Sequence, residues 1–309
     1  MENSQSVLND IVLMHLKEQK SKQRWRWVKR IVFALFLIFA SYQWFSLDAK
    51  DKADKASPHV GLIDLQGTIF EGQAASADNL VKGLDDAYQN EGLKALIIRI
   101  NSPGGSPVQA DYMFNAIKRY KVKHPDIKIY AVCVDLCASA AYYVAAASDE
   151  IYANPSSMVG SIGVIYNGFG FVDLMQKLGV TRRLQTAGVN KGFLDPFSPA
   201  SPEQAKILQG MLDSVHEQFI AKVEEGRGKR LHATPDTFSG LVWTGVDAKN
   251  MGLIDGFASS GELATEVLKL DSIIDYTFQP NFYEKLAKNF GTAMADQLPR
   301  ALGMKPGLQ

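Results

Sequence analysis

The alternation of apolar, β-branched runs with helical stretches constrains the fold of this chain more than its other features. Four runs have the length and composition of buried strands: residues 60–65, 95–100, 127–134 and 150–153. Helical patterns lie between them, at residues 77–90, 107–122 and 139–148. Strands that alternate with helices form βαβ units with parallel strands buried on both faces. The body of the chain is therefore predicted to be an α/β domain.

A longer helix is predicted over residues 201–227. It begins Ser201-Pro202-Glu203, with a serine in the capping position and a proline at the first helical position. The chain has 309 residues, of which 46% are hydrophobic and 21% charged. This composition excludes disordered and low-complexity classes and is sufficient for a large core.

An apolar run precedes this body. Ile31 to Leu47 is 17 residues long and carries no charge, which is the lower edge of a membrane span. Trp25 and Trp27 precede the run and Trp44 lies near its end, as is typical of residues at a bilayer interface. A core helix and a cleaved signal peptide are alternatives, but the run is longer and starts later than a secretory h-region. We therefore predict an uncleaved single span over residues 31–47.

The charge distribution predicts the topology of this span. Lys plus Arg and Asp plus Glu both number 33, yet residues 1–30 hold seven basic residues against three acids. The positive-inside rule places such a segment in the cytoplasm. We expect a cytoplasmic segment 1–30, the span, a charged linker 48–58 and an extracytoplasmic (periplasmic) domain 59–309, anchored in the inner membrane. The zero net charge excludes the basic footprint of a nucleic-acid binder.

The turn at residues 101–106 directly follows a predicted strand and precedes a predicted helix. Gly104 and Gly105 permit close approach of a ligand to the backbone. No Lys-Ser/Thr pair and no further glycine completes a nucleotide-binding motif. Either the turn is purely structural, or it presents a backbone N–H group to an oxyanion.

Ser139 lies where the strand 127–134 gives way to a helix of small residues. A serine at this junction either caps the helix or serves as a nucleophile, and a nucleophile needs a base. The chain has five histidines, but none lies between residues 125 and 215. A Ser-His-Asp arrangement of the Clp type is therefore disfavoured.

Two cysteines, Cys133 and Cys137, are too few for a disulfide scaffold. Their spacing of four, with Cys133 inside a strand, favours small buried residues over a redox pair.

Four motifs in one order carry a resemblance to a known family: INSPGGS, ASAAYYVAAASDEIYANPSSMVGSIGV, AGVNKGFLDPF and VWTGVDAKNMGLIDG. Together they resemble the signal peptide peptidase A family of membrane-bound serine-lysine peptidases, over about residues 60–268. The resemblance implies a fold similar to the crotonase and Clp-protease superfamily, a superhelix of βαβ units. It also implies a serine endopeptidase without metal or cofactor.

The resemblance assigns roles to individual residues. Ser139 corresponds to the nucleophile, Lys191 to the general base, and Ser161 to the serine that hydrogen-bonds this lysine. The N–H groups of Gly105 and Ala140 correspond to the oxyanion donors. A lysine base must be desolvated, because a free lysine with a pKa of about 10.4 is almost entirely protonated at neutral pH.

One departure from the family concerns Ala140-Ala141, where the pattern usually has two glycines. An alanine is strained there only if its φ is positive. The departure motivates one alternative, a non-catalytic membrane scaffold that retains the fold. A crotonase-type acyl-CoA enzyme is the second alternative, although it would rarely need a membrane span.

The resemblance also implies substrates and assembly. The expected substrates are apolar peptides such as signal-peptide remnants, near the lipid bilayer. Single-domain members form rings in which an adjacent subunit supplies the base. Ser139 and Lys191 are 52 residues apart on different elements, so the sequence permits a dyad within one chain or between two.

Overall fold

The computed structural model describes residues 25, 27–39, 41–43 and 53–279. The chain divides into two compact units, residues 1–57 and 58–309. In the first unit, residues 27–39 and 41–43 are helical and exposed. Within the described ranges, no helix combines the length and the apolar character that crossing a bilayer requires. Part of the predicted span 31–47 lies outside the described residues, and the span stays a prediction.

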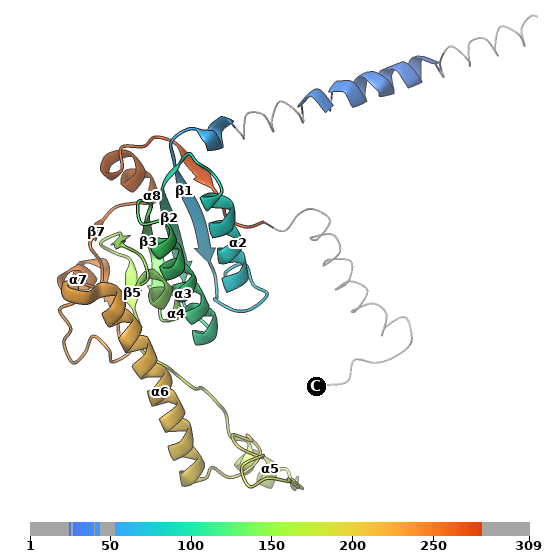
Figure 1. Ribbon diagram of the computed structural model, residues 1–309. Coiled ribbons are helices and arrows are strands. Elements are labelled where there is room, and N and C mark those ends of the chain that lie inside the picture. The colour runs from blue at the N-terminus through green and yellow to red at the C-terminus, as the bar shows by residue number, and fades with distance from the viewer. Residues whose placement is uncertain (1–24, 26, 40, 44–52, 280–309) are drawn as a thin grey trace, which may run out of the picture. The chain divides into compact units, whose positions relative to one another are not determined.

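The second unit is built on one mixed sheet (Figure 1). Its strands are β1 (His59–Gln66), β2 (Leu93–Ser102), β3 (Lys128–Ala138), β4 (Glu150–Ala153), β5 (Met158–Gly160), β6 (Val242–Thr244), β7 (Gly256–Phe257) and β8 (Ile273–Asp275). The order is β6-β5-β3-β2-β1-β8, with β4 paired to β3 and β7. Neighbours β1, β2, β3 and β4 pair in parallel, and β5 pairs with β6 antiparallel. The predicted α/β class with parallel strands is confirmed.

The α-helices of the second unit are α2 (Ala77–Tyr88), α3 (Pro107–Lys123), α4 (Ala140–Ala145), α5 (Val172–Lys177), α6 (Pro202–Arg227), α7 (Gly245–Asn250) and α8 (Ser260–Glu262), the last continued by η2 (Leu263–Val267). Three predicted helices, at residues 77–90, 107–122 and 201–227, are confirmed close to their predicted bounds, and α5, α7 and α8 lie outside the predicted ranges. The predicted start of α6 is confirmed, because Ser201 accepts a hydrogen bond from the N–H of Gln204 and Pro202 follows it. The sequence pattern at 139–148 yields only the short helix α4.

Both faces of the sheet are buried, as parallel strands require. Alternate residues of β2 show this: Ile98 and Ile100 pack toward α2, α3 and α4. Ile97 faces the other way and packs with Leu263 and Ala264. A fully buried isoleucine contributes roughly 1.5–3 kcal/mol relative to an exposed one, so the sheet is a rigid support for the strand ends.

A bulge in β3 shapes the edge that carries Ser139. Ile100 pairs with Cys133 and Ser102 with Cys137, so the register shifts between these two pairs. Both cysteines are buried and free. The prediction that they are small buried residues is confirmed, and the bulge brings their side chains close together. Burial first, and then this contact, raise the pKa of Cys137.

The segment before α6 is packed differently from the rest of the unit. We call residues 164–201 the arm. The helix of the arm, α5, has no buried residue. The next helix, α6, buries only Phe219, Val223 and Arg227, which lie in its last third. The arm therefore extends from the sheet and meets the exposed N-terminal end of α6 (Figure 1).

Candidate active site

The turn between β3 and α4 holds Ser139 in a backbone conformation that few residues other than glycine adopt. Its φ is 56° and its ψ is −126°, which costs roughly 1–3 kcal/mol. Its N–H donates to the carbonyl of Gly160 at 2.8 Å, and its carbonyl accepts from the N–H of Tyr143 at 3.0 Å. The hydroxyl makes no capping hydrogen bond to α4. Ser139 is therefore positioned by its backbone, and its Oγ remains available.

Gly104 and Gly105 bring the preceding turn against this serine. The φ of Gly104 is 100°, and a Cβ there would lie 2.8 Å from the Cβ of Ser139 and 2.9 Å from the nitrogen of Ala140. Gly105 has a φ of 151°, and a Cβ there would collide with the carbonyl of Ile69. Both positions therefore require glycine, because a side chain would push the turn away from Ser139.

Two backbone N–H groups beside this serine have no acceptor within the part of the chain that the structure describes. The N–H of Ile69 donates to the carbonyl of Gly104 at 2.9 Å, and its carbonyl accepts from the N–H of Ser106 at 2.8 Å. The N–H of Gly105 lies between these two bonds, and the N–H of Ala140 is the first of α4. Neither donates to any residue that the structure describes. Both are therefore available to an oxygen atom next to Ser139.

The departure from two glycines adds no strain to this turn. Ala140 and Ala141 are the first two residues of α4, and both are buried. Neither is among the described residues with positive φ, whereas Ser139 is. The alanine side chains are therefore compatible with the local backbone geometry.

A cavity of about 130 Å³ opens beside Ser139, Gly105 and Ala140. The remaining lining is mostly apolar: Pro107, Tyr143, Gly163, Val164, Ile165, Val215 and Phe219. An apolar cavity of about 150 Å³ is large enough to bind benzene. The cavity therefore has room for one apolar side chain next to the hydroxyl and the two N–H groups.

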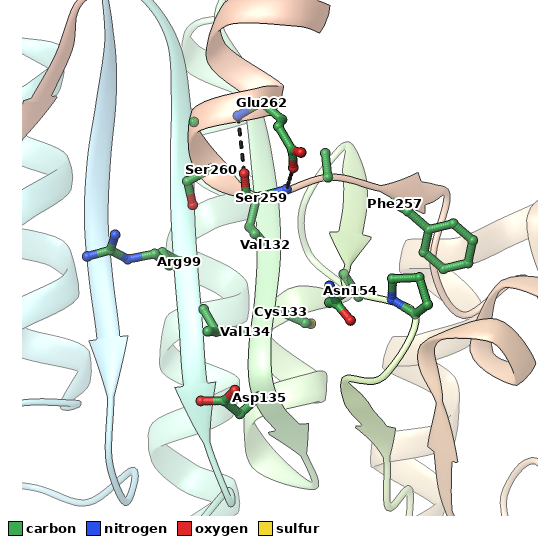
Figure 2. Close-up of a pocket in the computed structure, with 14 residues that line it drawn as sticks. Arg99, Val132, Cys133, Val134, Asp135, Asn154, Phe257, Ser259, Ser260 and Glu262 are labelled. Carbon is green, nitrogen blue, oxygen red and sulfur yellow. Dashed lines mark hydrogen bonds between the residues drawn. The ribbon is translucent and has the colours of Figure 1, made fainter.

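A larger cavity, of about 600 Å³, lies between β3, β4 and the start of α8 (Figure 2). Its charged groups already have partners: Arg99 forms an ion pair with Asp64 at 2.5 Å, and Asp135 accepts from the side chain of Asn101 at 3.0 Å. None of the five predicted site residues lines it. Among the described residues, no group of three or more His, Cys, Asp and Glu side chains is placed to hold a metal ion.

Ser161 lies at the end of a strand adjacent to β3. It directly follows β5, whose Gly160 pairs with Ala138. Its φ is 51°, and its N–H donates to the carbonyl of Leu241 at 2.7 Å. Two neighbouring strands therefore both end in a serine with positive φ, Ser139 and Ser161.

Lys191 does not join this cluster within one chain. It lies in the arm, where its N–H donates to the carbonyl of Gly188 at 3.1 Å and its side chain is exposed. It is not part of the lining of the Ser139 cavity. The neighbouring Val189 is 97% exposed. One chain alone therefore does not form the desolvated environment that a lysine base needs.

The cavity wall contains residues that the sequence analysis did not single out. Tyr143 lies four residues after Ser139, on the same helical face, so helical spacing is a signal that could have found it. Val215 and Phe219 come from α6, some 75 residues further along the chain, and no local pattern marks them. Their contribution depends on how α6 packs.

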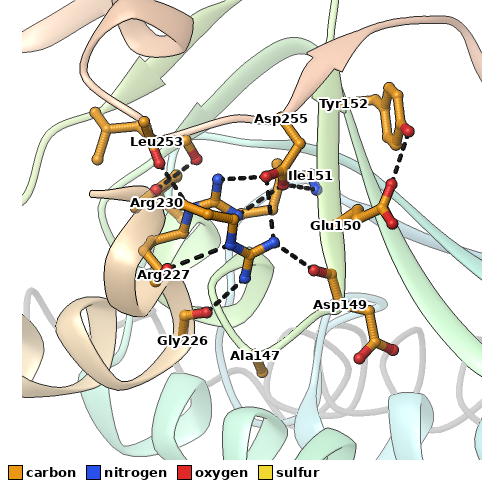
Figure 3. A network of polar contacts seen from close by, with 12 residues as sticks. Ala147, Asp149, Glu150, Ile151, Tyr152, Gly226, Arg227, Arg230, Leu253 and Asp255 are labelled. Carbon is orange, nitrogen blue, oxygen red and sulfur yellow. Dashed lines mark hydrogen bonds and ion pairs between the residues drawn. The ribbon is translucent and has the colours of Figure 1, made fainter. Parts of the chain in front are cut away.

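Figure 3 shows a charge network at the C-terminal end of α6, which the sequence analysis also did not find. Arg227 is buried and donates to both oxygens of Asp255, at 2.8 and 2.9 Å, and to the carbonyl of Gly252 at 2.8 Å. Arg230 adds a third bond to Asp255, which also accepts from the N–H of Ile151 in β4. Burial raises the pKa of Asp255, but the hydrogen bonds and charge of Arg227 outweigh it and lower the pKa overall. The network fastens α6 to the sheet.

Comparison with known proteins assigns the family. The model of Peptidase family S49 matches residues 121–273, which include Ser139, Ser161 and Lys191. A protein of Methanocaldococcus jannaschii that is named a protease is 30% identical over 218 residues, covering 69% of this chain and 69% of its own. The chain belongs to peptidase family S49. The resemblance to signal peptide peptidase A proteins is thereby confirmed.

Other relatives differ in length from this S49 chain. A Na(+)/H(+) antiporter NhaA of Brucella abortus (strain 2308) is 42% identical over 202 residues, which cover 64% of this chain but only 27% of the antiporter. A protein of Enterococcus faecium named a signal peptide peptidase is 29% identical, over 69% of this chain and 61% of its own. A solved structure, a membrane-bound stomatin-specific protease, is 18% identical with a TM-score of 0.41, covering 73% of this chain and all of that one.

Proposed function

We propose that this S49 peptidase is a membrane-anchored serine endopeptidase with Ser139 as nucleophile and Lys191 as general base. One observation carries the proposal: a serine at positive φ, with an uncommitted hydroxyl, lies beside two uncommitted N–H groups and an apolar cavity. Strained backbone of this kind clusters at active sites, where it aims a reacting group. A purely structural turn has no need of all three features together.

The proposed reaction begins with attack by the Ser139 hydroxyl on the carbonyl carbon of a peptide bond. The carbonyl oxygen becomes negative, and the N–H groups of Gly105 and Ala140 donate to it. Loss of one such donor in a known peptidase costs roughly 2.7–4 kcal/mol of transition-state stabilisation. The tetrahedral intermediate then collapses: the C–N bond breaks, the protonated base gives its proton to the leaving amine, and the acyl group stays on the Ser139 oxygen. Water then hydrolyses this acyl-enzyme. The same amine that accepts the serine proton activates this water.

We propose that this amine is Lys191 of a neighbouring subunit in a ring, with Ser161 as its hydrogen-bond partner. The exposed position of Lys191 on the arm supports an arrangement between chains. The arm also exposes apolar side chains: Ile165, Phe169, Leu174, Leu178, Val180 and Val189. Burial of these side chains against a second copy would remove them from water and desolvate the turn that carries the lysine.

The substrates proposed are apolar peptides, including signal-peptide remnants. The apolar lining of the Ser139 cavity supports this class, since one side chain of the substrate would enter it. A relative named a signal peptide peptidase points the same way. The mechanism uses only groups of the protein and water, so it needs no metal, nucleotide or other cofactor.

The proposed location follows from the apolar run and the charge bias. The span 31–47 anchors the chain in the inner membrane, and the linker 48–58 tethers a peptidase domain on the periplasmic side. Protease treatment of inverted and right-side-out vesicles tests this topology. Digestion of residues 59–309 from the cytoplasmic face would overturn it.

A fluorophosphonate probe, which reacts with activated serines, tests the catalytic proposal on the full chain. We expect labelling at Ser139 and cleavage of an apolar peptide, with both lost in Ser139→Ala. Ser156→Ala, which changes an exposed loop serine, is the matched control and should keep both. Absence of labelling and cleavage in the wild-type protein would favour the non-catalytic scaffold.

A further inference from the structure

Behind the Ser139 cavity, a network of polar side chains around Asp111 connects three helices. Asp111 of α3 accepts a hydrogen bond from the hydroxyl of Tyr143 in α4 at 3.1 Å and another from the side-chain amide of Asn115 at 2.8 Å. The oxygen of Asn115 accepts from the amine of Lys222 in α6 at 3.4 Å. This polar network therefore links α4, α3 and α6.

Tyr143 is the residue of this polar network that lines the cavity. Its ring centroid lies 5.0 Å from that of Phe219 in α6 and 5.7 Å from that of Phe114 in α3, the latter edge-on. Tyr143 is only 5% exposed, and Tyr143 and Phe219 both line the cavity. The ring is thus held between two aromatic side chains, and its hydroxyl is paired with Asp111.

The charge of Asp111 strengthens this hold. Burial, followed by the charge of Asp111 and the hydrogen bond to it, raises the pKa of Tyr143. The phenol therefore stays protonated and donates to the Asp111 carboxyl oxygen, and hydrogen bonds to charged groups are stronger than neutral ones. Loss of this bond from either partner would leave the ring held only by its aromatic neighbours, so it could move away from the cavity. Asp111 thus restrains the ring that forms part of the wall.

We propose that Asp111 is a positioning residue for substrate selection: by holding Tyr143 it sets the size of the apolar side chain that the cavity admits. The inference rests on the proposed function, because the selected group is the substrate side chain that enters beside Ser139. Asp111 does not line the cavity, so it acts through Tyr143.

The first test removes the hydrogen bond from either side. Tyr143→Phe deletes only the hydroxyl, and Asp111→Ala deletes the acceptor. Peptides that differ only in alanine, leucine or phenylalanine before the cleaved bond report the selection. We expect kcat/KM for phenylalanine relative to leucine to rise about fivefold in both variants, mainly through KM. A misfit of one methylene group changes such ratios by roughly ten- to two-hundredfold, so a partial relaxation of the wall gives a smaller factor.

A double variant tests whether Asp111 acts through Tyr143. In the Tyr143→Phe background, Asp111→Ala should cause no further change in selection, because the shared bond is already absent. Asp111→Asn retains an acceptor oxygen and should restore most of the wild-type ratio. Lys118→Ala is the matched control, since it removes a second link between α3 and α6, the ion pair with Glu225 at 3.2 Å, without contacting Tyr143. In Lys118→Ala, the ratio of kcat/KM for the phenylalanine and leucine peptides should remain that of the wild-type protein.

Peptide binding to Ser139→Ala separates this inference from the proposed function. The Kd ratio of the phenylalanine and leucine peptides should shift by the same factor when Tyr143→Phe is added. A wild-type protein that neither cleaves nor binds the peptides would overturn the proposed function. If the wild-type protein cleaves them but the folded variants keep its ratio, Asp111 does not position the wall and the inference is wrong. If Asp111→Ala fails to fold, the milder Tyr143→Phe variant decides.

Discussion

The two halves of the candidate dyad lie in regions that differ in packing. The serine half, with Ser139, Gly105 and Ala140, is built at the edge of a sheet buried on both faces, and its turns are fixed by backbone contacts. The lysine half, with Lys191, is on an arm whose helix buries no residue. One chain thus completes the surroundings of the proposed nucleophile and leaves the proposed base exposed to solvent.

This difference gives a physical reason for assembly. A monomer can hold a serine in a strained turn, because contacts with the surrounding sheet offset the cost of the strained backbone. A monomer does not keep an exposed lysine in its neutral form, because an exposed amine stays protonated. If the neighbour supplies the desolvation, the base becomes active only in the assembled protein, and isolated chains are inactive.

Loss of either half should have the largest effect. We expect Ser139→Ala and Lys191→Ala each to lower kcat by at least about a thousandfold, because members of a catalytic unit fail together. Ser161→Ala should cause a smaller loss, since it removes only the orienting partner. Steady-state hydrolysis of an apolar peptide measures all three.

Lys177→Ala is the control for the lysine variant, because this residue is also exposed on the arm. It should retain wild-type turnover. Near-normal turnover in Lys191→Ala would mean that another group is the base and that the comparison of the two halves is mistaken.

A mixing experiment tests whether the halves come from different chains. Subunits with Ser139→Ala and with Lys191→Ala are each inactive, but an interface between them can pair an intact serine with an intact lysine. Random equal mixing in a closed ring should restore about one quarter of the wild-type activity. Subunit exchange is verified by mass spectrometry of differently tagged chains. No recovery after full exchange would show that each chain holds its own dyad.

The same contrast explains which features the sequence could predict. Strands β1 to β4, the cap of α6 and the junction at Ser139 depend on local periodicity and small residues, so they could be predicted from neighbouring positions, whereas the short strands β5 to β8 were not predicted. The five site residues came from motifs, and the structure brings four of them to adjacent strand ends and turns. The exposed setting of Lys191 could not be predicted, because it depends on packing that one chain does not contain.

Tertiary contacts account for the other features that the sequence analysis did not find. Phe219 reaches the cavity because the charge network of Arg227 and Asp255 fixes the end of α6, and no local signal links these positions. The contact between Cys133 and Cys137 depends on a bulge, and a bulge is a property of the pairing between β2 and β3 rather than of β3 alone. These features require the partner strand or helix to be known.

Breaking the network at Asp255 should loosen the connection between the two halves, since α6 directly follows the arm and also contributes Val215 and Phe219 to the Ser139 cavity. Asp255→Ala leaves the buried Arg227 guanidinium without its carboxylate, which should lower the free energy of unfolding by about 3 kcal/mol. Asp64→Ala is the control, because its partner Arg99 has 42% of its side chain exposed and exposed pairs contribute about 0–1 kcal/mol. Urea unfolding measures both. Equal losses in the two variants would contradict the structural role of the network.

The pH dependence of stability provides a second measurement at Asp255. Its folded pKa is lowered from the ordinary value of 3.8, so the charged form favours folding. This contribution is fully present above the ordinary value and is lost as the pH falls through the lowered pKa. As the pH falls from neutral to below 3.8, the free energy of unfolding should therefore decrease less in Asp255→Asn than in the wild-type protein. Parallel acid unfolding curves for the two proteins would count against this role.

The smallest effect concerns the strain in the serine half itself. Glycine adopts the φ of 56° at position 139 without penalty, whereas alanine keeps the strain and also lacks the hydroxyl. Ser139→Gly should therefore be more stable than Ser139→Ala by about 1 kcal/mol. This difference is what remains of the relieved strain after the greater entropy of glycine in the unfolded chain is subtracted. At the next position the sign reverses, because Ala140 is helical and Ala140→Gly should destabilise by about 0.5–1 kcal/mol. Urea unfolding of the three variants gives both differences. A less stable Ser139→Gly would mean that the turn is relaxed, and the serine half would then owe its geometry to neighbouring contacts rather than to stored strain.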